Sequence, residues 1–172
     1  MRIRALSAAA GALLLASCVT PTPKPAPPLP PPPPSAPVET PPPADWRDLP
    51  LAAGDWRWSP GRAEFGVVGG APLLALRCQA GTVTIAARGS LAPGAQARLA
   101  FTASDGAFGY PAGPGEGGMI VAQTSSGDPG LDKLAFSRGR FAVAAPEAGL
   151  QRTLLPVRPE IGRLIEDCRR GG

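Results

Sequence analysis

Proline is the residue that most constrains how this chain can fold, and much of it lies in one segment. Residues 21–43 are mostly proline, with an unbroken run from Pro30 to Pro34. Because proline fixes φ and has no amide hydrogen to donate, this segment cannot join a helix interior or the middle of a sheet. We expect residues 18–45 to form a tether with a polyproline II spacer. At about 3.1 Å per residue, residues 19–43 of this tether reach roughly 75 Å. A docking site for proline-reading domains is the alternative.

The first 17 residues have the parts of a bacterial export signal. Positive charge at Arg2 and Arg4 precedes an apolar segment, Ala5–Leu15. That segment is too short to cross a bilayer, because a helical span takes about 20 apolar residues. We therefore expect residues 1–17 to be a cleaved signal peptide.

The end of this signal, Leu15-Ala16-Ser17-Cys18, is similar to the lipobox of bacterial lipoproteins. That resemblance implies that the Cys18 thiol receives a diacylglycerol and becomes the new N-terminus, anchored in a membrane by its acyl chains. Val19 stands where such lipoproteins carry an aspartate when they stay at the inner membrane. The resemblance therefore implies the outer membrane, facing the periplasm. An ordinary secretory signal is the alternative, and it would leave Cys18 as an unpaired thiol.

The cysteines and the absence of histidine limit the chemistry of the chain. It has three cysteines and no histidine. If Cys18 is acylated, Cys78 and Cys168 are left in an oxidising compartment, where we expect them to form one disulfide. Without histidine there is no Ser-His-Asp, Cys-His or histidine-ligand metal arrangement, and two cysteines alone make a poor zinc site. We expect no metal, no cofactor and no enzymatic activity.

The charge of the chain is modest. The whole sequence carries +4, but the loss of Arg2 and Arg4 with the signal leaves 15 basic against 13 acidic side chains, a net charge of +2. A nucleic-acid-binding domain normally carries a much stronger positive charge. We therefore expect no nucleic-acid partner.

Residues 46–172 are long enough for a single globular domain, and their hydrophobic pattern is mostly that of strands. Short stretches of alternating polarity are separated by turn residues such as Pro60-Gly61 and Ala80-Gly81. Closely spaced short strands predict an antiparallel barrel or sandwich. The expected strands lie at 55–58, near 65–67, and at 74–79, 82–88, 95–104, 108–110, 119–123, 140–145 and 150–155.

Two helical segments interrupt this pattern. Asp128-Pro129 predicts the start of a helix of about two turns. Pro159 predicts the start of a C-terminal helix, in which Ile161, Leu164, Ile165 and Cys168 form one apolar stripe. Because Cys78 shares a strand face with Leu74 and Leu76, both cysteines are expected to face the core. The disulfide should then attach the C-terminal helix to the 74–79 strand.

Three segments, Leu76–Cys78, Asp132–Phe141 and Glu160–Arg169, resemble a group of uncharacterised alphaproteobacterial lipoproteins and exported proteins. This resemblance implies an exported lipoprotein and transfers no activity. More distantly, the export signal, the compact β domain and the single disulfide are similar to the membrane-bound inhibitors of c-type lysozyme.

The densest positive cluster, Ser137–Arg140, is the strongest candidate binding site. Arg138 and Arg140, two apart on an expected strand, would face the same way and could hold a carboxylate or a phosphate, such as a peptidoglycan stem peptide or a lipid A phosphate. In the alternative, these arginines cap the carbonyls of the preceding helix or pair with acidic side chains. The acidic candidates are Asp128, Asp132 and Glu166.

Other candidates have simpler structural interpretations. Trp56 and Trp58 could form a platform for a sugar, but anchoring of the first hairpin in the core explains them as well. Glu166 and Asp167 point about 100° apart on a helix and do not share a substrate. Residues 111–118 lack the context of a phosphate-binding loop and are expected to be a flexible loop.

Together these features predict a periplasm-facing outer-membrane lipoprotein that acts as a non-enzymatic binding or structural module of the cell envelope. Its partners would be the membrane, through the lipid on Cys18, and an envelope protein or peptidoglycan. The alternative is a lysozyme-inhibitor-like protein that acts on a cell-wall hydrolase through residues 111–118.

Overall fold

The computed structural model describes residues 45–171. The predictions about the signal peptide, the lipid on Cys18 and the spacer up to residue 44 lie outside that range. The elements are, in chain order, η1 (Trp46–Asp48), β1 (Asp55–Ser59), β2 (Arg62–Gly66), β3 (Leu74–Gln79), β4 (Thr82–Arg88), β5 (Ala97–Ala103), β6 (Gly106–Pro114), β7 (Met119–Ser125), α1 (Pro129–Ala135), β8 (Arg140–Ala145), η2 (Pro146–Ala148), β9 (Leu150–Pro156) and α2 (Pro159–Arg170).

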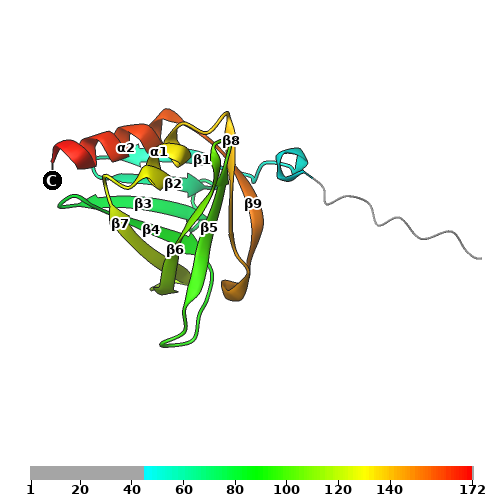
Figure 1. Cartoon of the computed structure of the whole chain (residues 1–172). Helices are drawn as coiled ribbons and strands as arrows, with labels where there is room; N and C mark the ends of the chain where they lie inside the picture. Colours follow the sequence, from blue (N-terminus) through cyan, green and yellow to red (C-terminus); the bar gives the residue numbers. More distant parts are fainter. Residues whose placement is uncertain (1–44, 172) are drawn as a thin grey trace, which may run out of the picture. The chain divides into compact units, whose positions relative to one another are not determined.

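The nine strands form one antiparallel sheet in the order β1-β2-β3-β4-β7-β6-β5-β8-β9, which curls into a half-barrel (Figure 1). The predicted fold, mostly β and antiparallel with a short helical turn and a C-terminal helix, is confirmed. Three of the predicted strands, 74–79, 82–88 and 140–145, have the predicted bounds.

The two edges of the sheet, β1 and β9, are joined by a short seam. The Ala52 amide donates to the Leu154 carbonyl at 2.8 Å, beside an isolated parallel bridge between Leu51 and Leu154. The buried indole of Trp56 donates from Nε1 to the Pro156 carbonyl, also at 2.8 Å. These contacts cover part of the two edges, which would otherwise present unpaired backbone groups.

The β1–β2 and β3–β4 hairpins use the turn residues that the sequence predicts. Ser59 pairs with Arg62, and Gly61 between them has a φ of +70°, as the third position of a type II turn requires. At the β3–β4 turn, Ala80 and Gly81 have φ values of +47° and +73°. Positive φ at both central positions is typical of a type I′ turn, which matches the twist of the strands it joins.

The prediction of a flexible loop over residues 111–118 is wrong for its first half, because β6 continues to Pro114. Pro111 and Pro114 each lie where β6 has a partner strand on only one side. At Pro111 the partner is β5, and β7 pairs with β6 only from Gly113 onward. At Pro114 the partner is β7, because the pairing with β5 ends at Ala112. A proline without an amide donor is tolerated at such strand edges.

The core lies inside the curled sheet, and its centre is aromatic. Phe101 on β5 is 1% exposed, and its ring centroid lies 5.2 Å from Phe108, 6.2 Å from Tyr110 and 6.3 Å from Phe141. Offset and edge-on aromatic pairs at these distances add to the free energy gained from burying apolar area. The strands on either side of β5 are therefore packed against one side chain.

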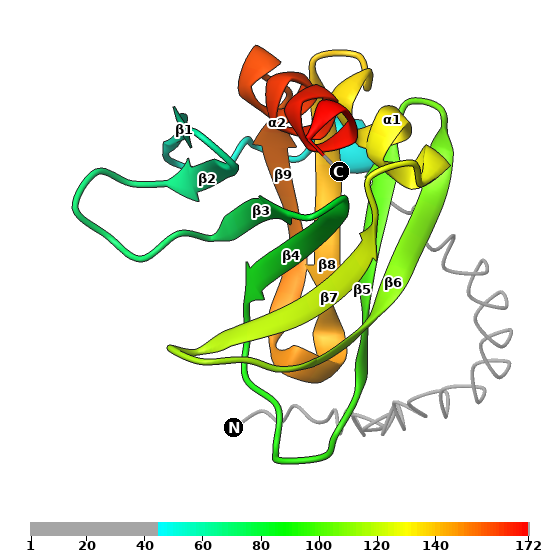
Figure 2. The ribbon, with the colours of Figure 1, turned by 90° about the vertical axis from the view of Figure 1, so that its left-hand side faces the viewer.

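The helix α2 lies across one end of the half-barrel, at the same end as α1 (Figure 2). Its apolar stripe is buried as predicted, with Ile161, Leu164, Ile165 and Cys168 at most 1% exposed. The predicted disulfide between Cys78 on β3 and Cys168 on α2 is present, with the two Cα atoms 5.5 Å apart. Within residues 45–171, no helix has the length and apolarity needed to cross a membrane.

Candidate anion-binding site

The helix α1 and the turn after it position the predicted arginines. The Asp128 carboxylate accepts a hydrogen bond from the Gly130 amide at 2.7 Å, so it caps the start of α1, and Leu131 and Leu134 bury one face of the helix. Phe136 ends the helix and leads directly into Ser137–Arg140. The predicted start of this helix at Asp128-Pro129 is therefore confirmed.

Two serines hold the turn in place. The Ser137 hydroxyl, on a side chain only 5% exposed, donates to the Arg140 carbonyl at 2.6 Å and accepts from the Ser104 amide at 2.9 Å. The Arg138 amide donates to the Ser104 hydroxyl oxygen at 2.9 Å. These reciprocal bonds fix the backbone of Arg138 and Arg140 against the β5–β6 turn.

The prediction that Arg138 and Arg140 share one strand face is wrong. The strand β8 begins at Arg140, and Arg138 lies in the turn before it, separated by Gly139 with a φ of +75°. A positive φ is readily adopted by glycine and interrupts an extended strand. Both arginines nevertheless line the same pocket.

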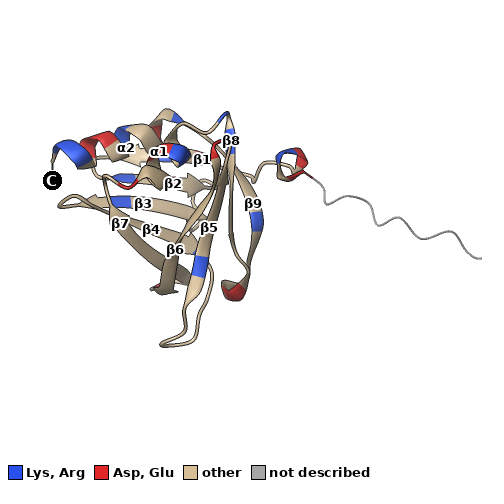
Figure 3. Cartoon of the chain, viewed as in Figure 1, with Lys and Arg blue, Asp and Glu red and all other residues tan. Residues whose placement is uncertain are grey.

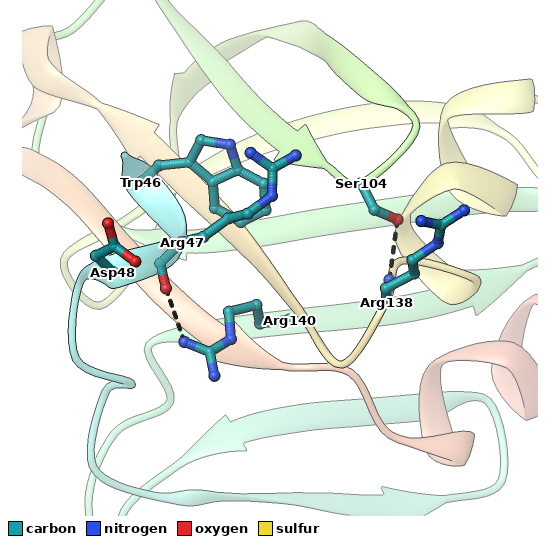
Figure 4. A pocket seen from close by; sticks show the side chains of 6 residues that line it. All are labelled: Trp46, Arg47, Asp48, Ser104, Arg138 and Arg140. Atoms are coloured by element: carbon teal, nitrogen blue, oxygen red, sulfur yellow. Dashed lines mark hydrogen bonds between the residues drawn. The ribbon is translucent and has the colours of Figure 1, made fainter. Parts of the chain in front are cut away.

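This pocket is open, has a volume of about 670 Å³, and has η1 as its other wall. The Arg140 guanidinium donates to the Arg47 carbonyl at 2.9 Å. The Arg47 guanidinium lies 4.7 Å from the Trp46 ring centroid and bonds the Asp45 carboxylate at 3.3 Å. Figure 4 shows Trp46, Arg47 and Asp48 on one side of the pocket and Ser104 with Arg138 on the other. Three arginines therefore line one pocket.

The arginines of the turn have no acidic partner among residues 45–171. Neither Arg138 nor Arg140 is within 4.0 Å of a carboxylate oxygen in that range. The expected acidic partners are otherwise engaged, because Asp128 bonds Tyr110 and the Gly130 amide, and Asp132 pairs with Arg169 at 2.8 Å. The interpretation of these arginines as ion-pair partners is therefore wrong. The cap interpretation fails for Arg140, because its guanidinium bonds the Arg47 carbonyl on η1 and not a carbonyl of the preceding helix.

The other charges near the pocket are of both signs. Asp48 also lines the pocket, and the Arg47 amide, 3.0 Å from the Asp45 carboxylate, lowers the pKa of Asp45. Asp45 is therefore ionised at neutral pH. Figure 3 shows that both signs of charge also occur on α2, whereas most of the strand length carries no charge.

Sequence reasoning missed Arg47 and Ser104. Arg47 lies immediately after the predicted spacer, and its contact with Arg140 spans 93 positions. The only local signal was the grouping of Asp45, Trp46, Arg47 and Asp48 directly after the prolines. Ser104 had no signal, because a serine in a hairpin turn is ordinary.

The tryptophans of the first hairpin and the acidic residues of α2 lie outside the pocket. Trp56 is 6% exposed and part of the core, so it cannot form a sugar platform, while Trp58 is half-buried under the Arg163 guanidinium, 5.0 Å from its ring centroid. Asp167 bonds Arg170 at 2.5 Å. No three His, Cys, Asp or Glu residues among those described are grouped to hold a metal ion.

Tyr110 links α1 to the sheet, and its titration gives a test of the fold beside the pocket. Burial, followed by the Asp128 carboxylate that accepts its hydroxyl hydrogen at 2.7 Å, raises the pKa of Tyr110 well above the usual value. A folded-state pKa above the unfolded value of about 10 stabilises the protein fully below pH 10. As the pH rises through the folded-state pKa, this stabilisation is lost.

We therefore expect tyrosinate absorbance to appear, in a titration of the full chain, only well above pH 10. Tyr110 is the only tyrosine, so the absorbance reports one group. Asp128→Asn should lower the pKa of Tyr110 part of the way toward its usual value, because the burial of the hydroxyl remains. Tyr110→Phe should remove this contribution to the pH dependence of unfolding and cost about 1 kcal/mol at neutral pH. Ordinary ionisation near pH 10 with the fold intact would contradict the expectation.

Comparison with known proteins does not assign this chain to a family. No protein-family model, no curated protein and no solved structure matches the chain.

Proposed function

We propose that this protein is a non-enzymatic binding module of the bacterial cell envelope, anchored in the outer membrane by a lipid on Cys18 and facing the periplasm. Its binding site is the pocket lined by Arg47, Arg138 and Arg140. The ligand is an envelope component that presents a carboxylate or a phosphate.

The observation that carries the proposal is a pair of arginines in a pocket, whose backbone is held by the hydrogen bonds of Ser137 and Ser104 and which have no acidic partner among residues 45–171. Guanidinium groups form two parallel hydrogen bonds with carboxylate or phosphate, and these are among the strongest that proteins make. The Ser137 and Ser104 bonds fix the backbone that carries both arginines, so less ordering is needed when a ligand binds. An open pocket of about 670 Å³ is in the size range of ligand sites.

The sequence and the disulfide support the envelope location. The lipobox-like segment before Cys18 argues for acylation, and the disulfide between Cys78 and Cys168 is of the kind that persists in oxidising compartments. The absence of histidine from the sequence supports a binding role over a hydrolytic one.

The proposal is tested by measuring binding to the purified full chain. Calorimetric titration with peptidoglycan fragments and with lipid A should give saturable binding to one of them. Arg138→Gln and Arg140→Gln should each weaken it by about 10-fold or more, since a charge-assisted hydrogen bond contributes about 1.5–3 kcal/mol. The matched control is Arg152→Gln, an exposed arginine on β9 outside the pocket, which should bind like wild type. Wild-type affinity in both pocket variants, or no binding to either ligand, would refute the assigned site.

Two further measurements address the anchor and the alternative function. Radioactive palmitate should label the wild type and leave Cys18→Ala unlabelled. Equal labelling of the two proteins would refute lipid attachment at Cys18. Stoichiometric inhibition of lysozyme that persists in the Arg138→Gln variant would favour an inhibitor instead. Such an inhibitor would have to act outside the pocket, for example through the exposed turn Gly115–Gly118.

A further inference from the structure

The short helix η1 forms one wall of the pocket but is weakly attached to the rest of the domain. None of its side chains is buried. Its hydrogen bond to the body is the one from the Arg140 guanidinium to the Arg47 carbonyl, and the next backbone bond to the sheet comes at Ala52. A segment with few buried contacts opens at a low cost in free energy. The position of η1 is therefore sensitive to what binds in the pocket.

The Arg47 side chain is also available to a ligand. Its ion pair with Asp45 joins two side chains that are 53% and 49% exposed. Exposed pairs of this kind contribute little, because solvent screens them and both side chains lose freedom. A stronger anion in the pocket can therefore replace Asp45 as the partner of Arg47.

The set of donors around the pocket fits a phosphate better than a carboxylate. Arg138 and Arg140 come from the turn before β8 and from its first residue, and Arg47 comes from η1. The Ser104 hydroxyl, which accepts from the Arg138 amide, keeps its hydrogen to donate. A phosphate monoester carries close to two negative charges and three acceptor oxygens, whereas a carboxylate has one charge and two oxygens. Three guanidinium groups can bond the three acceptor oxygens of the phosphate, and their positive charge exceeds the negative charge of Asp48, which also lines the pocket, by enough to offset that of the phosphate.

We propose that the pocket binds a phosphate monoester, with Arg47 as a third ligand beside Arg138 and Arg140, and that binding fastens η1 to β8. The proposal rests on the function proposed above and assigns both its ligand class and a coupled movement. Because the ligand is held by η1 and by the body together, it binds the docked form of η1 more tightly. By linkage, docking of η1 and binding of phosphate favour each other by the same factor.

The test combines affinity with hydrogen exchange on the full chain, with inorganic phosphate and acetate as probes. We expect phosphate to bind about 10-fold more tightly than acetate. Saturating phosphate should slow amide exchange in residues 46–49 by about 10-fold. Arg47→Gln should lose the preference for phosphate and the slowed exchange, yet still bind anions through Arg138 and Arg140. The control Arg152→Gln should behave as wild type.

The outcomes separate the two proposals. If phosphate binds Arg47→Gln as tightly as wild type and exchange in residues 46–49 is unchanged, this inference is wrong while the pocket remains an anion site. If wild type binds neither anion, both proposals fail. Two further arms identify the source of the phosphate. Tighter binding to lipid A micelles than to glucose 1-phosphate assigns it to a glycolipid, and equal binding assigns it to a soluble sugar phosphate.

Discussion

Replacing Cys78 and Cys168 together with alanine is expected to lower the free energy of unfolding by about 4 kcal/mol. The disulfide joins residues 90 positions apart, and in the chain-entropy model a loop of this length restricts the unfolded chain by roughly that amount. The melting temperature should fall by about 10–15 °C, since 1 kcal/mol corresponds to a few degrees for a domain of this size. Chemical denaturation and calorimetry of the full chain measure both.

The loss of stability in this double variant should also differ between parts of the molecule. The helix α2 keeps its buried Ile161, Leu164 and Ile165 but loses its covalent link to β3, so its amides should exchange faster than those of β4 or β5. Cys18→Ala is the matched control, because the proposed lipid site takes no part in the bond, and it should unfold at the same denaturant concentration as wild type. An unchanged midpoint in the double variant, or two free thiols in oxidised wild-type protein, would rule this account out.

Phe101→Ala is expected to cost about 3–5 kcal/mol. The side chain is 1% exposed and contacts three other aromatic rings, so its removal leaves a cavity that the surrounding strands cannot fill by a small movement. Denaturation by urea should show the lower midpoint with a similar slope.

Phe136→Ala is the control for the same chemical change. Phe136 is 73% exposed at the end of α1, so its truncation removes little buried area, and the free energy of unfolding should change by less than about 0.5 kcal/mol. Equal losses in the two variants would mean that Phe101 is not the centre of the core.

The strands were predictable where their signals are local. Leu74–Gln79 and Thr82–Arg88 place their large apolar side chains at alternate positions on either side of Ala80-Gly81, so one short stretch of sequence shows both the strand period and the turn. The extent of β6 was not predictable in this way, because whether Pro111 is tolerated depends on which side of the strand has a partner. The pairing of β4 with β7, across an inserted hairpin, is likewise decided by packing that no short window contains.

In the candidate site, too, the residues with a local sequence signal were predictable and those placed by long-range contacts were not. The density of charge in Ser137–Arg140 marked two arginines of the pocket, and the two cysteines were paired by their number and their faces. Arg47 could not be found, because its place in the pocket depends on η1 folding back against β8 from the opposite end of the chain. The expected ion pairs of Arg138 and Arg140 with Asp128 and Asp132 failed because other groups bind these two carboxylates.

The seam between β1 and β9 has a mechanical consequence. A pull on residue 45 against the C-terminal end of α2 loads the hydrogen bond from Arg140 to the Arg47 carbonyl, and then the contacts of Leu51 and Ala52 with Leu154. Once they part, β1, β2 and most of β3 can peel away, but the covalent bond between Cys78 and Cys168 stops the unfolding of the residues between these cysteines. At about 3.5 Å per residue, only roughly 120 Å of chain can be drawn out. Under tension the protein would therefore extend only to the length that the disulfide permits, and most of its sheet would stay intact.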